Sequence, residues 1–257
     1  MKKIKISYNN SNEIAYITLD DGKGNILDAV MMDQLLELLD NFKDMKTLKL
    51  IIFKGEGKHF SFGASVEEHT RDNCGDMLKS FHKLFYNLID LAIPTAAIVS
   101  GQCLGGGLEL ALICNFIFCD KTAVFGQPEV VLGVFPPPAS LILPMKIGQA
   151  KADDLLITGR YIKAERAYEY GLINRIYDDK ESMNVGVEEW AIKHIAGKSA
   201  SSLRFAVKTA RSIFNTTLLN YLPMLEKYYN EELMNTEDAN EGINSFIEKR
   251  KPVWSNK

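Results

Sequence analysis

One stretch, residues 94–138, constrains the fold of this chain more than any other. An apolar run from Ala96 to Val99 predicts a buried strand, and three glycines at 105–107 follow it, directly before the helically spaced segment LELALI. A helix begins with backbone N–H groups that have no partner within the helix, so a turn without side chains lets an anionic atom approach them closely. The stretch therefore predicts a strand, a glycine turn and a helix start that can receive a negative charge.

Two carboxyl groups accompany this turn. Glu109 lies one turn into the predicted helix, and Glu129 follows twenty residues later in a loop that Pro128 stiffens. Two carboxyl groups beside a polarising backbone suit acid/base chemistry next to a developing oxyanion. Each piece also has a purely structural interpretation, because glycines form flexible turns, Glu109 can complement a helix dipole, and Glu129 can be a solvated loop charge.

Composition excludes several classes of protein. The 257 residues suffice for one large domain or two small ones, and 46% hydrophobic with 25% charged residues is ordinary for a soluble globular protein. A net charge of −3 argues against generic nucleic-acid binding. No apolar run reaches the roughly 20 residues that span a bilayer, and no long apolar core follows the amino-terminal lysines. We therefore expect a cytoplasmic protein that binds neither membranes nor nucleic acid.

The cysteines and histidines predict no metal site. The four cysteines lack paired CxxC spacing and the four histidines form no HExxH pair, so neither a zinc site nor a disulfide framework is indicated. Cys103 lies two residues before the glycines, where a nucleophile is conceivable. A buried free cysteine is the preferred interpretation, since such a thiol behaves as a small hydrophobic group.

The pattern before the central stretch predicts a mixed α/β arrangement. Residues 48–53 form a strand too uniformly apolar for a sheet edge, and buried strands joined through helices favour parallel pairing. A second glycine-rich turn, at 55–65, leads into a polar segment. The other predicted elements here are strands at 4–8 and 14–19 around a hairpin turn, an amphipathic helix over 31–42 and a helix over 77–91.

The pattern after the central stretch becomes helical. Prolines at 136–138 form a rigid segment that cannot enter a regular strand, and the last short strand is predicted at 172–177. We therefore divide the chain into an α/β part, about 1–190, and a helical part, about 191–257. Helical segments are predicted near 139–147, 150–157, 164–170, 182–196, 200–214, 217–234 and 236–250.

Taken together, three motifs carry a family resemblance. LGGGLE at 104–109, GQPE at 126–129 and HFSFGAS at 59–65 resemble the crotonase (enoyl-CoA hydratase/isomerase) superfamily, and the resemblance extends over nearly the whole chain. It implies a spiral of ββα units followed by a helical carboxy-terminal region, assembled as homotrimers or as homohexamers built from two trimers. It also implies an acyl-CoA thioester substrate, with no separate cofactor because coenzyme A is part of the substrate.

The resemblance assigns roles to the residues of the central stretch. The thioester carbonyl would sit between the backbone N–H groups of Ala64 and Gly106, which would stabilise the enolate formed by attack at the β-carbon. Members that hydrate double bonds have both carboxyl groups, and this chain matches both, at Glu109 and Glu129. Repulsion and burial push one carboxyl group toward protonation, which separates the proton donor from the base. We predict Glu109 as the water-activating partner and Glu129 as the main proton donor, a division that the sequence leaves open.

The resemblance also assigns the contacts to coenzyme A. Gly63 and Ser65 flank the oxyanion-hole alanine, and Phe246 and Lys249 match the aromatic and lysine of the terminal helix. Two departures matter: Ser65 stands where many members have aspartate, and residues 66–68 lack the lysine often found near the nucleotide. Lys249 also fits a simpler interpretation, a solvated basic helix end that complements the helix dipole.

Finer segments suggest a subfamily. Residues 59–69, 133–140, 199–207 and 231–234 resemble hydratases of cyclohexa-1,5-diene-1-carbonyl-CoA, which form 6-hydroxycyclohex-1-ene-1-carbonyl-CoA in anaerobic benzoyl-CoA breakdown. Another crotonase enzyme, such as a general enoyl-CoA hydratase, an isomerase or a ring-opening hydrolase, is the alternative. A non-catalytic scaffold that binds acyl-CoA is a third hypothesis, against which the two glutamates argue.

Overall fold

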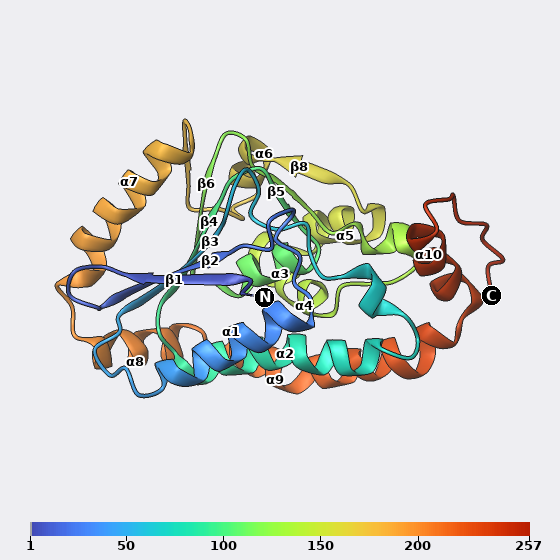
Figure 1. Cartoon of the computed structure of the whole chain (residues 1–257), viewed down its shortest axis with the longest axis horizontal. Coiled ribbons are helices and arrows are strands. Elements are labelled where there is room, and N and C mark those ends of the chain that lie inside the picture. The colour runs from blue at the N-terminus through green and yellow to red at the C-terminus, as the bar shows by residue number, and fades with distance from the viewer. Residues whose placement is uncertain (1) are drawn as a thin grey trace.

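A computed structural model describes residues 2–257 of the protein (Figure 1). The strands of these residues form two sheets. The larger sheet has the order β1-β2-β3-β4-β6-β9 and is parallel except for the β1–β2 hairpin. Its strands are β1 (Ile4–Tyr8), β2 (Ile14–Leu19), β3 (Leu50–Gly55), β4 (Thr95–Val99), β6 (Phe116–Asp120) and β9 (Arg175–Tyr177). The smaller sheet contains β5 (Gln102–Leu104), β7 (Val124–Gly126) and β8 (Tyr161–Lys163).

The chain alternates between the two sheets and then enters a helix. Strand β4 of the large sheet leads to β5 of the small sheet and then to α3 (Gly106–Ile113), and β6 leads in the same way to β7 and η2 (Pro128–Leu132). The turn before these follows the same path, because Ser61, after β3, bridges to Cys103 of β5. Repeating strand, strand and helix in this way produces the predicted spiral of ββα units.

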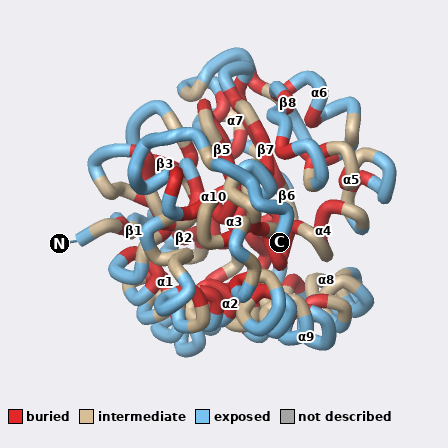
Figure 2. The backbone as a smooth tube through the Cα atoms, turned by 90° about the vertical axis from the view of Figure 1, so that its right-hand side faces the viewer, coloured by how far each residue is buried: buried red, intermediate tan, exposed pale blue. Residues whose placement is uncertain are grey.

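The large sheet is buried on both faces, which explains the continuous apolar runs of its central strands. In β3, Ile51 and Phe53 pack into the main core beneath the helices, whereas Leu50 and Ile52 pack into a second core on the opposite face. Figure 2 shows the buried segments inside the molecule and the exposed ones at its periphery. The prediction of buried, parallel strands is confirmed, although β3 covers 50–55 rather than 48–53.

Helices cover both faces of the large sheet. In Figure 1, α1, α2 and α9 lie side by side along one face, while α7 and α10 lie at opposite ends of the molecule. The remaining helical elements are α1 (Ala29–Phe42), η1 (Val66–His69), α2 (Cys74–Leu91), α4 (Pro137–Ile147), α5 (Gln149–Thr158), α6 (Ala164–Glu169), α7 (Lys180–Ala191), η3 (Ile192–Ala196), α8 (Ala200–Ala210), α9 (Ser212–Lys227), η4 (Tyr228–Glu232), η5 (Leu233–Asn235) and α10 (Glu237–Ile247).

Several predicted boundaries differ from the structure for physical reasons. Pro137 and Pro138 form the first turn of α4, where a missing N–H costs no hydrogen bond. The last strand is only Arg175–Tyr177, and α9 begins at Ser212 rather than near 217. Strands β5, β6, β7 and β8 were not predicted; three of them have three residues each, too few to show a period.

The predicted division at residue 190 falls inside one continuous helical stretch, formed by α7 and the π-helix η3. Val187 and Ile195, on either side of that point, pack into the same second core. The division into two parts stays a prediction. Within residues 2–257, no helix is both long and apolar enough to cross a membrane.

Candidate active site

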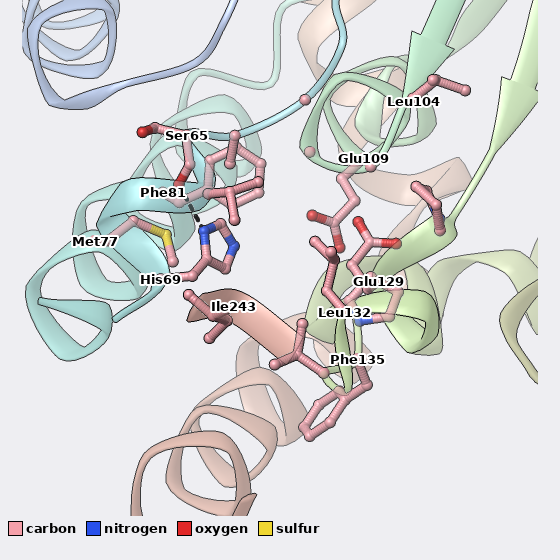
Figure 3. A pocket seen from close by; sticks show the side chains of 18 of the residues that line it. Ser65, His69, Met77, Phe81, Leu104, Glu109, Glu129, Leu132, Phe135 and Ile243 are labelled. Carbon is pink, nitrogen blue, oxygen red and sulfur yellow. Dashed lines mark hydrogen bonds between the residues drawn. The ribbon is translucent and has the colours of Figure 1, made fainter. Parts of the chain in front are cut away.

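A cavity of about 500 Å³ lies where the glycine turns, α2, η2 and α10 meet (Figure 3). Most of its wall is apolar, and a few polar groups interrupt it, which is the usual composition of a small-molecule site. The apolar lining comes mainly from Ile26, Phe62, Val66, Met77, Leu78, Phe81, Leu104, Leu132, Val134, Phe135, Ile243 and Phe246.

Close contacts with neighbouring atoms explain the glycine triplet at the start of α3, residues 105–107. Gly105 has φ +51°, and a β-carbon there would lie 2.7 Å from Oε1 of Glu129. A β-carbon on Gly106 would lie 3.1 Å from the backbone nitrogen of Ala64, and one on Gly107 would lie 2.6 Å from the Cβ of Ser61. The three glycines therefore bring the start of α3 against the second glycine-rich turn and against Glu129.

The Ala64 loop is held in place from behind. The Leu27 N–H donates to the Gly63 carbonyl at 2.9 Å, and the Ser61 hydroxyl accepts from the Gly63 N–H at 3.0 Å. The same hydroxyl donates to the Asn25 carbonyl at 2.7 Å. This anchoring fixes the direction of the Ala64 N–H.

Two backbone N–H groups therefore meet at the cavity without protein partners. Across residues 2–257, neither the Ala64 N–H nor the Gly106 N–H donates to a protein acceptor, and both residues line the cavity. The Gly106 N–H also lies at the positive end of α3. Paired free donors of this kind can hold a carbonyl oxygen that gains negative charge.

Glu109 is a buried carboxyl group in the first turn of α3, and 4% of its surface is exposed. Every residue of α3 is buried, so its one carboxyl group lies in an apolar environment. The Ala139 N–H donates to Glu109 Oε1 at 2.9 Å; it is the first N–H that α4 offers, because Pro137 and Pro138 have none. The proline run thus leaves one donor for Glu109.

Glu129 lies at the start of η2 and faces Glu109 in the cavity (Figure 3). Gln127 is fully buried beside it, and with its amide nitrogen turned toward the carboxyl group it donates to Oε2 at 2.9 Å and to Oε1 at 3.0 Å. Together with the close approach of Gly105, this amide fixes the orientation of Glu129.

The two carboxyl groups hold protons more tightly than usual. Burial raises the pKa of Glu109 to about 8, and the Ala139 N–H partly opposes this rise. Burial, and then the negative charge of Glu109, raise the pKa of Glu129 well above its usual range. Neighbouring carboxyl groups of this kind lose their protons one after the other, so one is an acid while the other is a base.

Comparison with known proteins agrees with this geometry. The sequence profile of the "Enoyl-CoA hydratase/isomerase" family matches residues 9–257. The chain belongs to this family. It is 42% identical to the cyclohexa-1,5-dienecarbonyl-CoA hydratase of Thauera aromatica, covering 99% of this chain and 97% of that protein. It is 32% identical to a carnitinyl-CoA dehydratase of Citrobacter koseri, with 94% of each chain covered.

Solved structures confirm the crotonase fold. An enoyl-CoA hydratase from Mycobacterium avium subsp. paratuberculosis superimposes with a TM-score of 0.86 at 18% identity, covering 99% of both chains. An enoyl-CoA hydratase from Bacillus halodurans gives a TM-score of 0.87 at 22% identity, covering 95% of this chain and 100% of that one.

Most of the site residues predicted from the family resemblance meet in this one cavity. Besides the two N–H donors and the two glutamates, Gly63, Ser65 and Phe246 line it. Phe246 is 55% exposed, at the rim. Lys249 is not among the lining residues; it follows α10 in an exposed turn with φ +56°, and its contact with coenzyme A stays a prediction.

Three further polar groups of the site were not predicted from the sequence. The Gln127 amide and the Ala139 N–H each contact a glutamate, and His69 lines the cavity at the end of η1. Gln127 is part of the GQPE motif, so its position next to Glu129 was a usable signal. The other two contacts depend on how α4 and η1 pack against α3.

Neither Cys103 nor a cluster of metal-ligating side chains marks a second site among residues 2–257. Cys103 is fully buried, and burial raises the pKa of its thiol well above the usual value, as expected of a structural cysteine. In the part of the chain that the structure describes, no group of three or more histidine, cysteine, aspartate or glutamate side chains is arranged to hold a metal ion.

Proposed function

We propose that the protein is a hydratase that adds water to cyclohexa-1,5-diene-1-carbonyl-CoA and gives 6-hydroxycyclohex-1-ene-1-carbonyl-CoA. The observation that carries the proposal is the pair of carboxyl groups with raised pKa values beside two free N–H donors in an apolar cavity. The 42% identity to the Thauera hydratase over almost the whole chain supports the cyclic substrate.

The proposed mechanism gives each of these groups one role. The thioester carbonyl oxygen accepts hydrogen bonds from the Ala64 and Gly106 N–H groups, which polarise the ring toward attack. Glu109, in its ionised form, removes one proton from water as the oxygen bonds to the β-carbon. The electrons of the C1=C2 bond move onto the carbonyl, which produces a dienolate.

The dienolate then takes a proton at a second carbon. Its charge is shared between the α-carbon and the far end of the other double bond. Glu129, whose pKa is raised by burial and by the negative charge of Glu109, donates its proton to the far carbon, and the result is net 1,4-addition with a double bond still conjugated to the thioester. Transfer of the proton from Glu109 to Glu129, directly or through water, restores the starting state.

We also propose a pathway, a cellular compartment and an oligomeric state for the protein. We place the reaction in anaerobic benzoyl-CoA degradation, in the cytoplasm, and we propose a homotrimer or homohexamer that requires no cofactor beyond the coenzyme A of its substrate. Sedimentation of the purified protein tests the assembly.

An acyl-CoA panel with product identification tests the reaction. We expect the cyclic diene to be hydrated faster than crotonyl-CoA, and in D₂O we expect deuterium at the far ring carbon. Deuterium only at the α-carbon, or faster hydration of crotonyl-CoA, would contradict the cyclic assignment and favour a general enoyl-CoA hydratase. Double-bond migration or ring opening without water addition would indicate the isomerase or hydrolase alternatives. Binding without any turnover would indicate a scaffold.

A further inference from the structure

His69 presents a hydrogen-bond acceptor to the reacting end of the cavity. Its Nδ1 lies 2.7 Å from the Ser65 carbonyl oxygen. Because a carbonyl oxygen only accepts, Nδ1 carries the hydrogen, and in the neutral ring Nε2 is then an acceptor. Burial lowers the pKa of His69, against a smaller opposing effect of the Ser65 bond, so the ring is neutral at pH 7.

The free nitrogen of this ring has no protein partner. Figure 3 shows the imidazole in the cavity, with Nε2 on the side that faces the carboxyl groups of Glu109 and Glu129. Among residues 2–257, no group donates to Nε2. Its neighbours along this wall, Met77 and Ile243, are apolar. A polar atom in such a wall is stabilised only when the ligand or water in the cavity supplies a donor.

The proposed reaction requires such an acceptor. Water has two O–H bonds, and only one proton passes to Glu109. Glu129 must point its own O–H at the far ring carbon, so it is poorly placed to orient the water as well. If the second O–H of water is left free, the water can rotate and its lone pair is not held toward the β-carbon.

We propose that His69 Nε2 accepts a hydrogen bond from the second O–H of the reacting water and thereby orients the water for attack. This role rests on the proposed hydratase function. As the C–O bond forms, the O–H bond directed at Glu109 breaks and the O–H bond directed at His69 remains. That bond becomes the hydroxyl of the product, so His69 gains no proton, and in the reverse direction it holds the leaving hydroxyl group.

Turnover of three variants tests this contact. His69→Leu removes the acceptor, and we expect kcat to fall about ten- to a hundredfold with KM for the cyclic diene within about twofold, as for a group that acts on the water rather than on the thioester. His69→Gln offers an amide oxygen and should recover at least part of the loss. His194→Leu makes the same change on an exposed surface and should match the wild type. A His69→Leu enzyme with wild-type kcat would overturn the proposal.

The ratio of two dissociation constants distinguishes the loss of this contact from a structural effect of the substitution. It does so independently of the substrate assignment. In a Glu109→Gln background, in which turnover is at least about a hundredfold slower, Kd is measured for 6-hydroxycyclohex-1-ene-1-carbonyl-CoA and for cyclohex-1-ene-1-carbonyl-CoA, which lacks the hydroxyl. We expect His69→Leu to reduce the preference for the hydroxylated ligand about fivefold, the size of one neutral hydrogen bond. Equal weakening of both ligands, or no change in the preference, would contradict the His69 contact.

Failure of the proposed function has a different signature. If the wild type hydrates another acyl-CoA but not the cyclic diene, the substrate assignment is wrong. The same ratio, measured with the hydroxylated and unhydroxylated forms of that acyl-CoA, then decides the role of His69. Should His69→Leu lower the melting temperature, His69→Met replaces it as a variant of similar length that has only a weak acceptor.

Discussion

The two walls of the cavity are built in different ways. On the α3 side the backbone is so closely packed that a single added β-carbon would lie 2.6–3.1 Å from its neighbours at Gly105, Gly106 and Gly107. On the α10 side, Phe246 is 55% exposed and Lys249 lies in an exposed turn. In the arrangement that we propose, the reacting atoms lie against the tightly packed wall, whereas the coenzyme A moiety lies against the exposed one. This difference predicts that changes on the first wall affect kcat and changes on the second affect KM.

The largest effects are expected at the carboxyl pair. Glu109→Gln and Glu129→Gln should each lower kcat at least about a hundredfold, the usual scale for a general acid or base, while thioester binding persists. Glutamine has nearly the same shape as glutamate, and at position 109 its amide oxygen can still accept the hydrogen bond from the Ala139 N–H. Steady-state kinetics and titration with an unreactive acyl-CoA measure the two properties. Near-normal turnover in either variant would remove that residue from the mechanism.

A smaller loss of kcat is expected when a methyl group narrows only the proposed oxyanion site, the space between the Ala64 and Gly106 N–H groups. In Gly106→Ala, the methyl group would lie 3.1 Å from the Ala64 nitrogen, in the space where we propose that the carbonyl oxygen binds. We expect kcat to fall about ten- to a hundredfold, up to the effect of losing one oxyanion donor. Gly197→Ala is the matched control, because a β-carbon there would meet nothing within 4 Å. Equal kcat in the two variants would show that the α3 wall is less rigid than its packing indicates.

The open wall should respond in KM alone. Phe246→Ala and Lys249→Ala remove groups remote from the reacting atoms, so KM for the acyl-CoA should rise about two- to fivefold while kcat is nearly unchanged. Lys251→Ala, two residues further along the chain, serves as the charge-matched control for Lys249. If KM is unchanged in Lys249→Ala, the lysine only complements the end of α10.

The same contrast explains what the sequence alone could predict. The tight wall depends on local motifs, so the glycine turn, the helix start and both glutamates were predicted and lie together. The Ala139 N–H bond to Glu109 and the orientation of His69 depend on how α4 and η1 pack, which no local pattern encodes. Strand β6 (Phe116–Asp120) was missed although it is apolar, because a short apolar run next to a helix has no period that distinguishes strand from helix.

Protein stability, rather than turnover, reports the energetic cost of the buried acid pair. In the folded protein the pKa of Glu109 is about 8, against an ordinary value of 4.5. As the pH rises, Glu109 therefore ionises in the unfolded chain at a lower pH than in the folded protein. Its contribution to stability is complete below about pH 4.5 and is lost as the pH rises toward 8. An amide at this position cannot ionise, so the melting temperature of Glu109→Gln relative to the wild type should increase by roughly 10 °C between pH 5 and pH 8. Glu232→Gln, on the exposed surface, should show no such trend. A melting-temperature difference that does not change with pH would mean that the pKa of Glu109 is not raised in the folded enzyme, and the energetic cost assigned to burying this carboxyl group would have to be revised.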